Sequence, residues 1–237
     1  MFALGAASRV VGVSDFAADL PEAAGKAHVG GFAPDLERVV SLAPDLIVVS
    51  KDGTDRAAFE KLEALGFTVV VTGGTTLAGV LEDLARVGHA LGEDERAAAV
   101  VAALTKRIAA AETLGRARPR TRALVLIWPD PPVAAGVGTF VGDVVAHAGF
   151  TNVVPQSAGD WPRVSFETLA SWNPDLLIRP ETPENTDVFK RAFGDARWRL
   201  VPAVSMGRVV ALPGGLLERP GPRLVEALER LAAVRVP

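Results

Sequence analysis

Cysteine and tyrosine are missing from this 237-residue sequence, and histidine occurs three times. Without cysteine, disulfides, thiolate metal ligands and cysteine nucleophiles are excluded. His28, His89 and His147 lie far apart in the sequence, whereas a transition-metal site needs several ligands that converge. We expect His89 and His147 to lie within helices, and His28, which precedes "VGGF", to lie in a loop that could face a cleft. The sequence therefore predicts no metal site of its own.

The motifs of common enzyme sites are missing as well. The sequence has no GxSxG, HExxH or GxxxxGK[ST], which excludes a nucleophile elbow, a zinc-protease helix and a P-loop. The segment "GVGTFVG" (136–142) lacks the third glycine of a dinucleotide-binding loop at the right offset, so we interpret it as a loop that leads into a helix. We predict that the chain is not an enzyme.

Charge and hydropathy exclude two further classes of partner. The net charge of −3 argues against nucleic acid or an anionic membrane surface. No apolar run approaches the roughly 18 residues that span a bilayer. The first ten residues also lack the basic start and apolar core of a signal peptide.

Strand and helix patterns alternate along the chain, of which 49% is hydrophobic. Strands that are apolar throughout, separated by helices, are typical of parallel sheets covered on both faces. The predicted strands are 9–13, 46–50, 67–72, 122–128, 174–179 and 207–212. The predicted helices are 35–43, 56–66, 75–92, 139–149, 186–194 and 219–234.

The longest helical pattern runs from Glu93 to about residue 118. It is rich in alanine, acidic at its start and basic at its end, as the helix dipole favours. Roughly 22 helical residues extend about 33 Å, the width of a small domain. The sequence therefore predicts an α/β fold of two lobes with mainly parallel sheets: an N-terminal lobe at 1–92, a connecting helix at 93–118 and a C-terminal lobe at 119–237.

One segment occurs twice, 130 residues apart. "LERVVSLAPDLIVV" (36–49) aligns without a gap with "FETLASWNPDLLIR" (166–179), and Glu, Ser, Pro, Asp and Leu coincide. Each copy carries a glutamate at its front edge, Glu37 in the first and Glu167 in the second. The repeat favours two lobes of like fold. The alternative is that a helix, a Pro-Asp turn and a strand form a common α/β connection that arose twice.

Several motifs in order resemble a known family. The segments "VGVSDF", "HVGGF", "DWPRVSFETLASWNPDLLI" and "GRVVALP", with the long helix, are similar to the substrate-binding proteins of ABC importers for cobalamin, haem and ferric siderophores, and above all to the cobalamin-binding proteins. The resemblance covers nearly the whole chain. It implies the class III periplasmic-binding-protein fold and a monomer that captures cobalamin between its lobes and delivers it to a permease dimer. It implies a location outside the cytoplasmic membrane, with a cytoplasmic one as the alternative if the start is native.

The resemblance also implies site residues. Trp161 matches a tryptophan that packs against the corrin, and Phe32 occupies an equivalent place in the first lobe. Ligand contact and ordinary core packing stay open as alternatives for a further set at predicted strand ends or loops: Phe16, Ser50, Phe140 and Trp128. Arg219 is either a rim or ligand contact or part of a helix start. The resemblance implies that Glu37 and Glu167 dock onto arginines of the permease; the alternative is two solvated glutamates stabilised by helix dipoles.

Two departures from the family pattern leave alternatives open. Ser50 stands where related proteins can carry a tryptophan, and no tyrosine occurs anywhere. A haem or ferric-siderophore carrier, or a metal-binding protein on a similar scaffold, is therefore kept beside the cobalamin carrier. Family members also begin with a strand before the helix that ends "FALGA". We expect a first lobe without that strand, through a trimmed start or a rearranged lobe.

Overall fold

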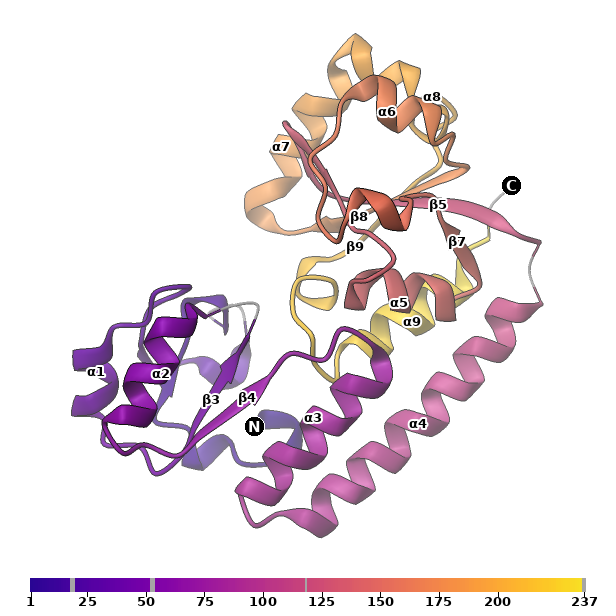
Figure 1. The fold of residues 1–237 in the computed structure, drawn as a ribbon. Coiled ribbons are helices and arrows are strands. Elements are labelled where there is room, and N and C mark those ends of the chain that lie inside the picture. The colour runs from indigo at the N-terminus through magenta and orange to yellow at the C-terminus, as the bar shows by residue number, and fades with distance from the viewer. Residues whose placement is uncertain (18–19, 52–53, 118, 236–237) are drawn as a thin grey trace. The chain divides into compact units, whose positions relative to one another are not determined.

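A computed structural model describes residues 1–17, 20–51, 54–117 and 119–235. The chain divides into two compact units, one formed by Met1–Gly74 with Ala78–Ala103 and the other by Thr75–Leu77 with Leu104–Pro237. The long helix α4 (Asp94–Arg116) contributes to both, as the division falls at Ala103 and Leu104. Figure 1 shows the fold as a ribbon coloured by residue number, from indigo at the N-terminus to yellow at the C-terminus. The expected last residue of this helix, 118, lies outside the described residues.

The first unit contains two parallel strand pairs. β1 (Gly12–Val13) pairs with β2 (Ala27–His28), and β3 (Ile47–Ser50) pairs with β4 (Val69–Thr72). Its further elements are α1 (Leu36–Ser41), α2 (Arg56–Ala64), most of α3 (Leu77–Ala90) and the 3₁₀ turns η1 (Phe2–Leu4), η2 (Ala7–Arg9), η3 (Asp15–Ala17) and η4 (Pro21–Ala23).

Two local predictions for this unit were wrong. The strand predicted at 9–13 is reduced to Gly12–Val13, because Ala7–Arg9 form a 3₁₀ turn. His28 lies in a strand rather than a loop, since its backbone pairs with that of Val13.

A buried carboxylate secures the turn between β4 and α3. Asp83, on α3, is 9% exposed, and its Oδ2 accepts hydrogen bonds from the backbone N–H groups of Gly73 and Gly74, each at 2.8 Å. Arg86 contacts the other carboxylate oxygen. Burial by itself would raise the pKa of Asp83, but the two N–H groups and Arg86 outweigh it and lower the pKa.

The second unit is built around β5 (Thr121–Pro129). β8 (Leu176–Glu181) lies parallel beside it, followed by β9 (Val209–Pro213). β7 (Phe150–Asn152) runs parallel to the first part of β5, and β6 (Pro132–Ala134) runs antiparallel to its last part. The sheet is therefore mainly parallel with one short antiparallel strand.

Helices cover this sheet and bury its apolar strands. They are α5 (Phe140–His147), α6 (Phe166–Ser171), α7 (Pro183–Gly194), α8 (Pro202–Ser205) and α9 (Leu224–Ala233), with the 3₁₀ turns η5 (Gln156–Ala158), η6 (Ala196–Leu200) and η7 (Gly214–Leu216). α5 and α9 lie side by side (Figure 1). Members of the core beside the sheet, all fully buried, include Leu124, Leu126, Leu169, Leu177, Phe189 and Trp198.

The second part of α4 packs directly onto the turn between α5 and β7. A Cβ atom at Gly115 would lie 2.6 Å from the backbone of Ala148, and one at Gly149, where φ is +85°, would lie 2.2 Å from the carbonyl oxygen of Gly115. Polar contacts flank this approach: His147 Nδ1 lies 2.5 Å from Glu112 Oε1. Glycine is needed at both positions, because no side chain fits between the two backbones.

The two copies of the sequence repeat fold alike. Asp35 and Ser165 cap α1 and α6 by accepting the backbone N–H three residues on. Ser41 and Ser171 donate their hydroxyls to the carbonyl three residues back, at 2.7 and 2.8 Å. Each helix is followed by a non-glycine residue with positive φ: Ala43 at 44° and Asn173 at 46°.

Candidate functional site

An exposed aromatic pair, Phe16 and Phe32, lies on the first unit. The two rings meet edge to face with centroids 4.8 Å apart, and their exposed fractions are 41% and 64%. The backbone fixes this pair: the N–H of Val29 donates to the carbonyl of Val13, and that of Asp15 to the carbonyl of Gly30. Large apolar side chains this exposed are candidates for ligand contact.

The chain turn before Phe32 depends on Gly30. Its φ is +89°, and a Cβ there would lie 2.8 Å from the carbonyl oxygen of Ala33. Beyond the turn, the carbonyl of Phe32 accepts the N–H of Asp55, the N-cap of α2, at 3.1 Å. Ser50 ends β3 and is partly buried, and its side chain makes no hydrogen bond with any described residue.

A histidine and a carboxylate border the aromatic pair. His28 Nδ1 lies 3.1 Å from Asp15 Oδ1, and both side chains are about half exposed. A Cβ at Gly31 would lie 3.5 Å from the Phe16 ring and 3.9 Å from Asp15 Oδ2, so the His28–Asp15 pair and the aromatic pair share one surface of the first unit. No sequence pattern pointed to Asp15, because its partner His28 lies on β2, a strand formed by a separate segment of the chain.

A second aromatic pair lies on the second unit. Trp161 is 44% exposed and packs on Phe140, which is 7% exposed, with ring centroids 5.9 Å apart. The loop that carries Trp161 is held by backbone bonds: the N–H of Gly136 donates to the Asp160 carbonyl at 2.7 Å, and that of Ala134 to the Pro162 carbonyl at 3.1 Å. The Trp161 side chain is therefore exposed, and its ring packs on Phe140 at the start of α5.

The loop that carries Trp161 explains why "GVGTFVG" contains glycine at positions 136 and 138. A Cβ at Gly136 would lie 2.3 Å from the carbonyl oxygen of Gly159, and one at Gly138 would lie 2.3 Å from Asp160 Oδ1. Thr139 then caps α5 by accepting the N–H of Gly142. The segment is a loop that leads into a helix, as predicted, and its glycines allow the Trp161 loop to approach.

Two more predicted residues lie on the second unit. Trp128, near the end of β5, is 41% exposed, and its indole N–H donates to the carbonyl of Asp130 at 2.9 Å. Arg219 lies just beyond η7 and is partly buried.

The two repeat glutamates are exposed and occupy the second position of their helices. Beside Glu37 lies a shallow apolar groove of about 430 Å³, lined also by Leu36, Val40, Ser41 and Leu65. The pKa of Glu167 is lowered, first by the hydrogen bond from its own backbone N–H and then by the Ser165 hydroxyl, with a further contribution from Arg197. Both carboxylates are therefore accessible to a partner's cation.

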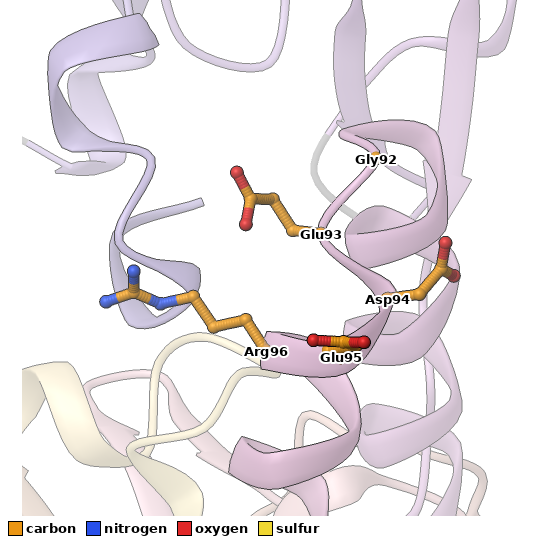
Figure 2. A pocket seen from close by; sticks show the side chains of 5 residues that line it. All are labelled: Gly92, Glu93, Asp94, Glu95 and Arg96. Atoms are coloured by element: carbon orange, nitrogen blue, oxygen red, sulfur yellow. The ribbon is translucent and has the colours of Figure 1, made fainter.

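A larger hollow of about 830 Å³ lies elsewhere on the first unit, where α4 begins. It is lined by Gly92, Glu93, Asp94, Glu95 and Arg96 (Figure 2). The acidic side chains are those that a helix start favours. Since none of the lining residues is aromatic, this hollow offers no face on which a flat ligand stacks.

Residues 1–17, 20–51, 54–117 and 119–235 contain neither a metal-binding cluster nor a helix able to span a membrane. Within them, no group of three or more His, Asp or Glu side chains is arranged to hold a metal ion. Among the described helices, none has the length and hydropathy needed to cross a membrane.

Comparisons with known proteins place the chain in a family. The family model described as periplasmic binding protein matches residues 1–216. The chain belongs to the periplasmic binding protein family. The resemblance found in the sequence is thereby confirmed, and so is the fold class: the class III fold of this family, with α/β units, mainly parallel sheets and a long backbone helix.

A cobalamin-binding protein of Halobacterium salinarum is 30% identical to the chain over 240 residues. The match covers 98% of the chain and 65% of that relative, so the chain spans less than two thirds of its length. The periplasmic vitamin B12-binding protein BtuF of Vibrio cholerae is similar in structure, with a TM-score of 0.84 at 23% identity, over 98% of this chain and 89% of that one. The haem-binding protein RhuT from Roseiflexus sp. RS-1 gives a TM-score of 0.87 at 26% identity, over 98% and 91%.

Proposed function

We propose that this protein is a non-enzymatic solute-binding protein that captures a corrinoid, cobalamin in particular, and delivers it to the permease dimer of an ABC importer. The observation that carries the proposal is the pair of exposed aromatic clusters, Phe16 with Phe32 on one unit and Trp161 with Phe140 on the other. Flat macrocycles are bound by aromatic and apolar faces with few polar contacts. Relatives named for cobalamin or vitamin B12 support the choice of ligand.

The proposal includes the division of the chain and the further contacts. The lobes are 1–92 and 119–237, joined by the helix 93–118, and the protein acts as a monomer outside the cytoplasmic membrane. Trp128, which is exposed at the end of β5, adds a third aromatic face. Ser50 and Arg219 are the polar members of the proposed ligand contact.

The test is a titration with cyanocobalamin, followed by calorimetry and by tryptophan fluorescence. Replacing Trp161 with Ala should weaken binding by about 1–3 kcal/mol, because a large aromatic anchor is lost. Met206→Ala, which removes another exposed apolar side chain, at the C-cap of α8, is the control and should leave the affinity unchanged. Equal affinities for the wild type and Trp161→Ala would show that Trp161 does not anchor the ligand.

A haem or ferric-siderophore carrier is the second candidate. The structural likeness to the haem-binding RhuT is as high as that to BtuF, and Ser50 leaves the first unit without a third aromatic ring at that position. A titration with hemin under the same conditions decides between the two, since the tighter ligand is read directly from the paired isotherms. Among the described residues, no group of three or more His, Asp or Glu side chains could hold a bare metal ion, so we do not propose a metal-ion carrier.

We also propose that Glu37 and Glu167 dock onto cations of the permease. Both are exposed, and each lies at the same place in a duplicated unit. Two like anchors suit a permease made of two like subunits. Exposed carboxylates contribute little to affinity alone, but complementary charge sets the orientation and the rate of docking.

A further inference from the structure

His28 and Asp15 form a side-chain pair at the ends of two neighbouring strands. His28 is the last residue of β2, and Asp15 lies two residues beyond the end of β1. The distance from Nδ1 to Oδ1 is 3.1 Å. A carboxylate accepts hydrogen bonds, so in the neutral ring Nδ1 carries the proton and Nε2 carries the lone pair. Among the described residues, Nε2 has no hydrogen-bond partner.

The surroundings of this pair distinguish it from an ordinary surface contact. Exposed pairs of this kind contribute little to stability, and here Asp15 leads directly into Phe16, whose ring packs on Phe32. The chain contains a similar pair, His89 Nδ1 and Asp94 Oδ1 at 3.0 Å, but no aromatic residue occurs between positions 80 and 100. The first pair, by contrast, directly adjoins an exposed aromatic residue in the chain.

The strands leave His28 and Asp15 little freedom to separate. Val13 and His28 are paired residues of the β1–β2 ladder, and the Asp15 N–H donates to the carbonyl of Gly30 at 3.0 Å. A Cβ at Gly31 would already lie 3.5 Å from the Phe16 ring. The imidazole, its carboxylate and the aromatic rings are therefore positioned by one continuous set of backbone hydrogen bonds.

A histidine whose second ring nitrogen donates to a carboxylate is the arrangement that orients metal-binding imidazoles and increases their basicity. A macrocycle that lies on aromatic side chains carries its metal at the centre. We propose that His28 Nε2 binds the axial site of the macrocycle's cobalt or iron, and that Asp15 orients the ring. The Nε2 lone pair forms the bond, the water in that axial site leaves, and no oxidation state changes. This inference rests on the proposed function.

Three probes separate this coordination from simple stacking. Aquocobalamin has a water ligand that an imidazole replaces, and cyanocobalamin has a cyanide that it does not replace. Hemin tests the same chemistry on iron, where coordination by imidazole changes the Soret band. Visible spectra and affinities are measured for each probe with the wild type, His28→Ala, His28→Gln, Asp15→Asn and the matched control His89→Ala.

The wild type and His89→Ala should shift the aquocobalamin spectrum, or the hemin spectrum if iron is the cargo. His28→Ala and His28→Gln should lose that shift and bind that probe roughly 10- to 100-fold more weakly, and Asp15→Asn should weaken it about tenfold. Cyanocobalamin affinity should be equal in all variants, which also shows that they are folded.

Three results would overturn the inference. If the shifts and affinities are the same in the wild type and in both His28 variants, His28 is not a ligand, although the proposed function stands. If His28→Ala weakens cyanocobalamin as much as aquocobalamin, the residue acts without the metal. If the wild type binds neither corrinoid nor hemin, the proposed function fails, and the inference fails with it.

Discussion

At the scale of single residues, Asp83 shows how one carboxylate holds a connection in place. It satisfies two backbone N–H groups at the end of β4, and Arg86 contacts its other oxygen. Because its pKa is lowered in the folded protein, the stability that it contributes is fully present above its unfolded pKa of about 3.9. That contribution is lost as the pH falls through the lower, folded pKa.

We predict that Asp83→Asn lowers the free energy of unfolding at pH 7 by about 1–2 kcal/mol, because charge-assisted hydrogen bonds are replaced by weaker ones. The variant should also lose part of the wild type's fall in stability below about pH 4. Urea unfolding at several pH values measures both effects. Glu82→Gln, an exposed neighbour on α3, is the control and should match the wild type. Parallel pH curves for Asp83→Asn and the wild type would contradict the assignment.

Some residues of the candidate site could be predicted from the sequence and others could not. The family resemblance pointed to Trp161, and its side chain is 44% exposed in the structure. Asp15 was missed, because its partnership with His28 depends on how two short strands pair. Strand register is set by backbone hydrogen bonds between segments far apart in the sequence, and a single sequence carries little trace of it.

At the scale of elements, the duplicated segment shows most clearly how similar sequences form similar structures. α1 and α6 have the same length, a side-chain N-cap of the same kind and a positive-φ residue two positions after their ends. They differ in what surrounds their glutamates. Glu37 borders an apolar groove, and Glu167 lies near Arg197, which stacks on the ring of Phe166.

We predict that Glu37→Gln and Glu167→Gln each weaken docking to the reconstituted permease by roughly two- to fivefold, mainly by slowing association at low salt. The double variant should show about the product of the two factors, because the sites lie in different units. Glu63→Gln, an exposed glutamate on α2, is the control. The association rates are measured with the transporter held in nanodiscs on a sensor surface. If the association rate changes neither with the two substitutions nor with the salt concentration, docking through these carboxylates is excluded.

Helices and long apolar strands were predicted well, and short strands were not. The predicted helix 75–92 corresponds to α3 and the strand 122–128 to β5. The three-residue strands β6 and β7 were missed. They carry too few residues for a periodic pattern, and their conformation follows from pairing with the two ends of β5.

At the scale of the whole molecule, the long helix governs how the chain can move. α4 is one unbroken helix of 23 residues, about 34 Å long, and the division between the two units falls within it. Hinge motion needs residues that absorb large changes of φ and ψ, and a continuous helix offers few.

We therefore predict that the radius of gyration, measured by small-angle scattering, is the same with and without saturating cyanocobalamin. A variant with two glycines in the middle of α4, at Ala102 and Ala103, is the comparison and should become more compact or more variable on binding. A marked compaction of the wild type would show that the helix does not restrain the units.

The contact between Gly115 and Gly149 bears on where such a helix can yield. The two main chains lie so close there that no side chain fits between them, and α4 packs tightly on the second unit over its last turn. Any adjustment on ligand capture must then be taken up nearer the start of α4. A spin label on that early stretch would detect any such adjustment, and one placed near residue 112 should show none.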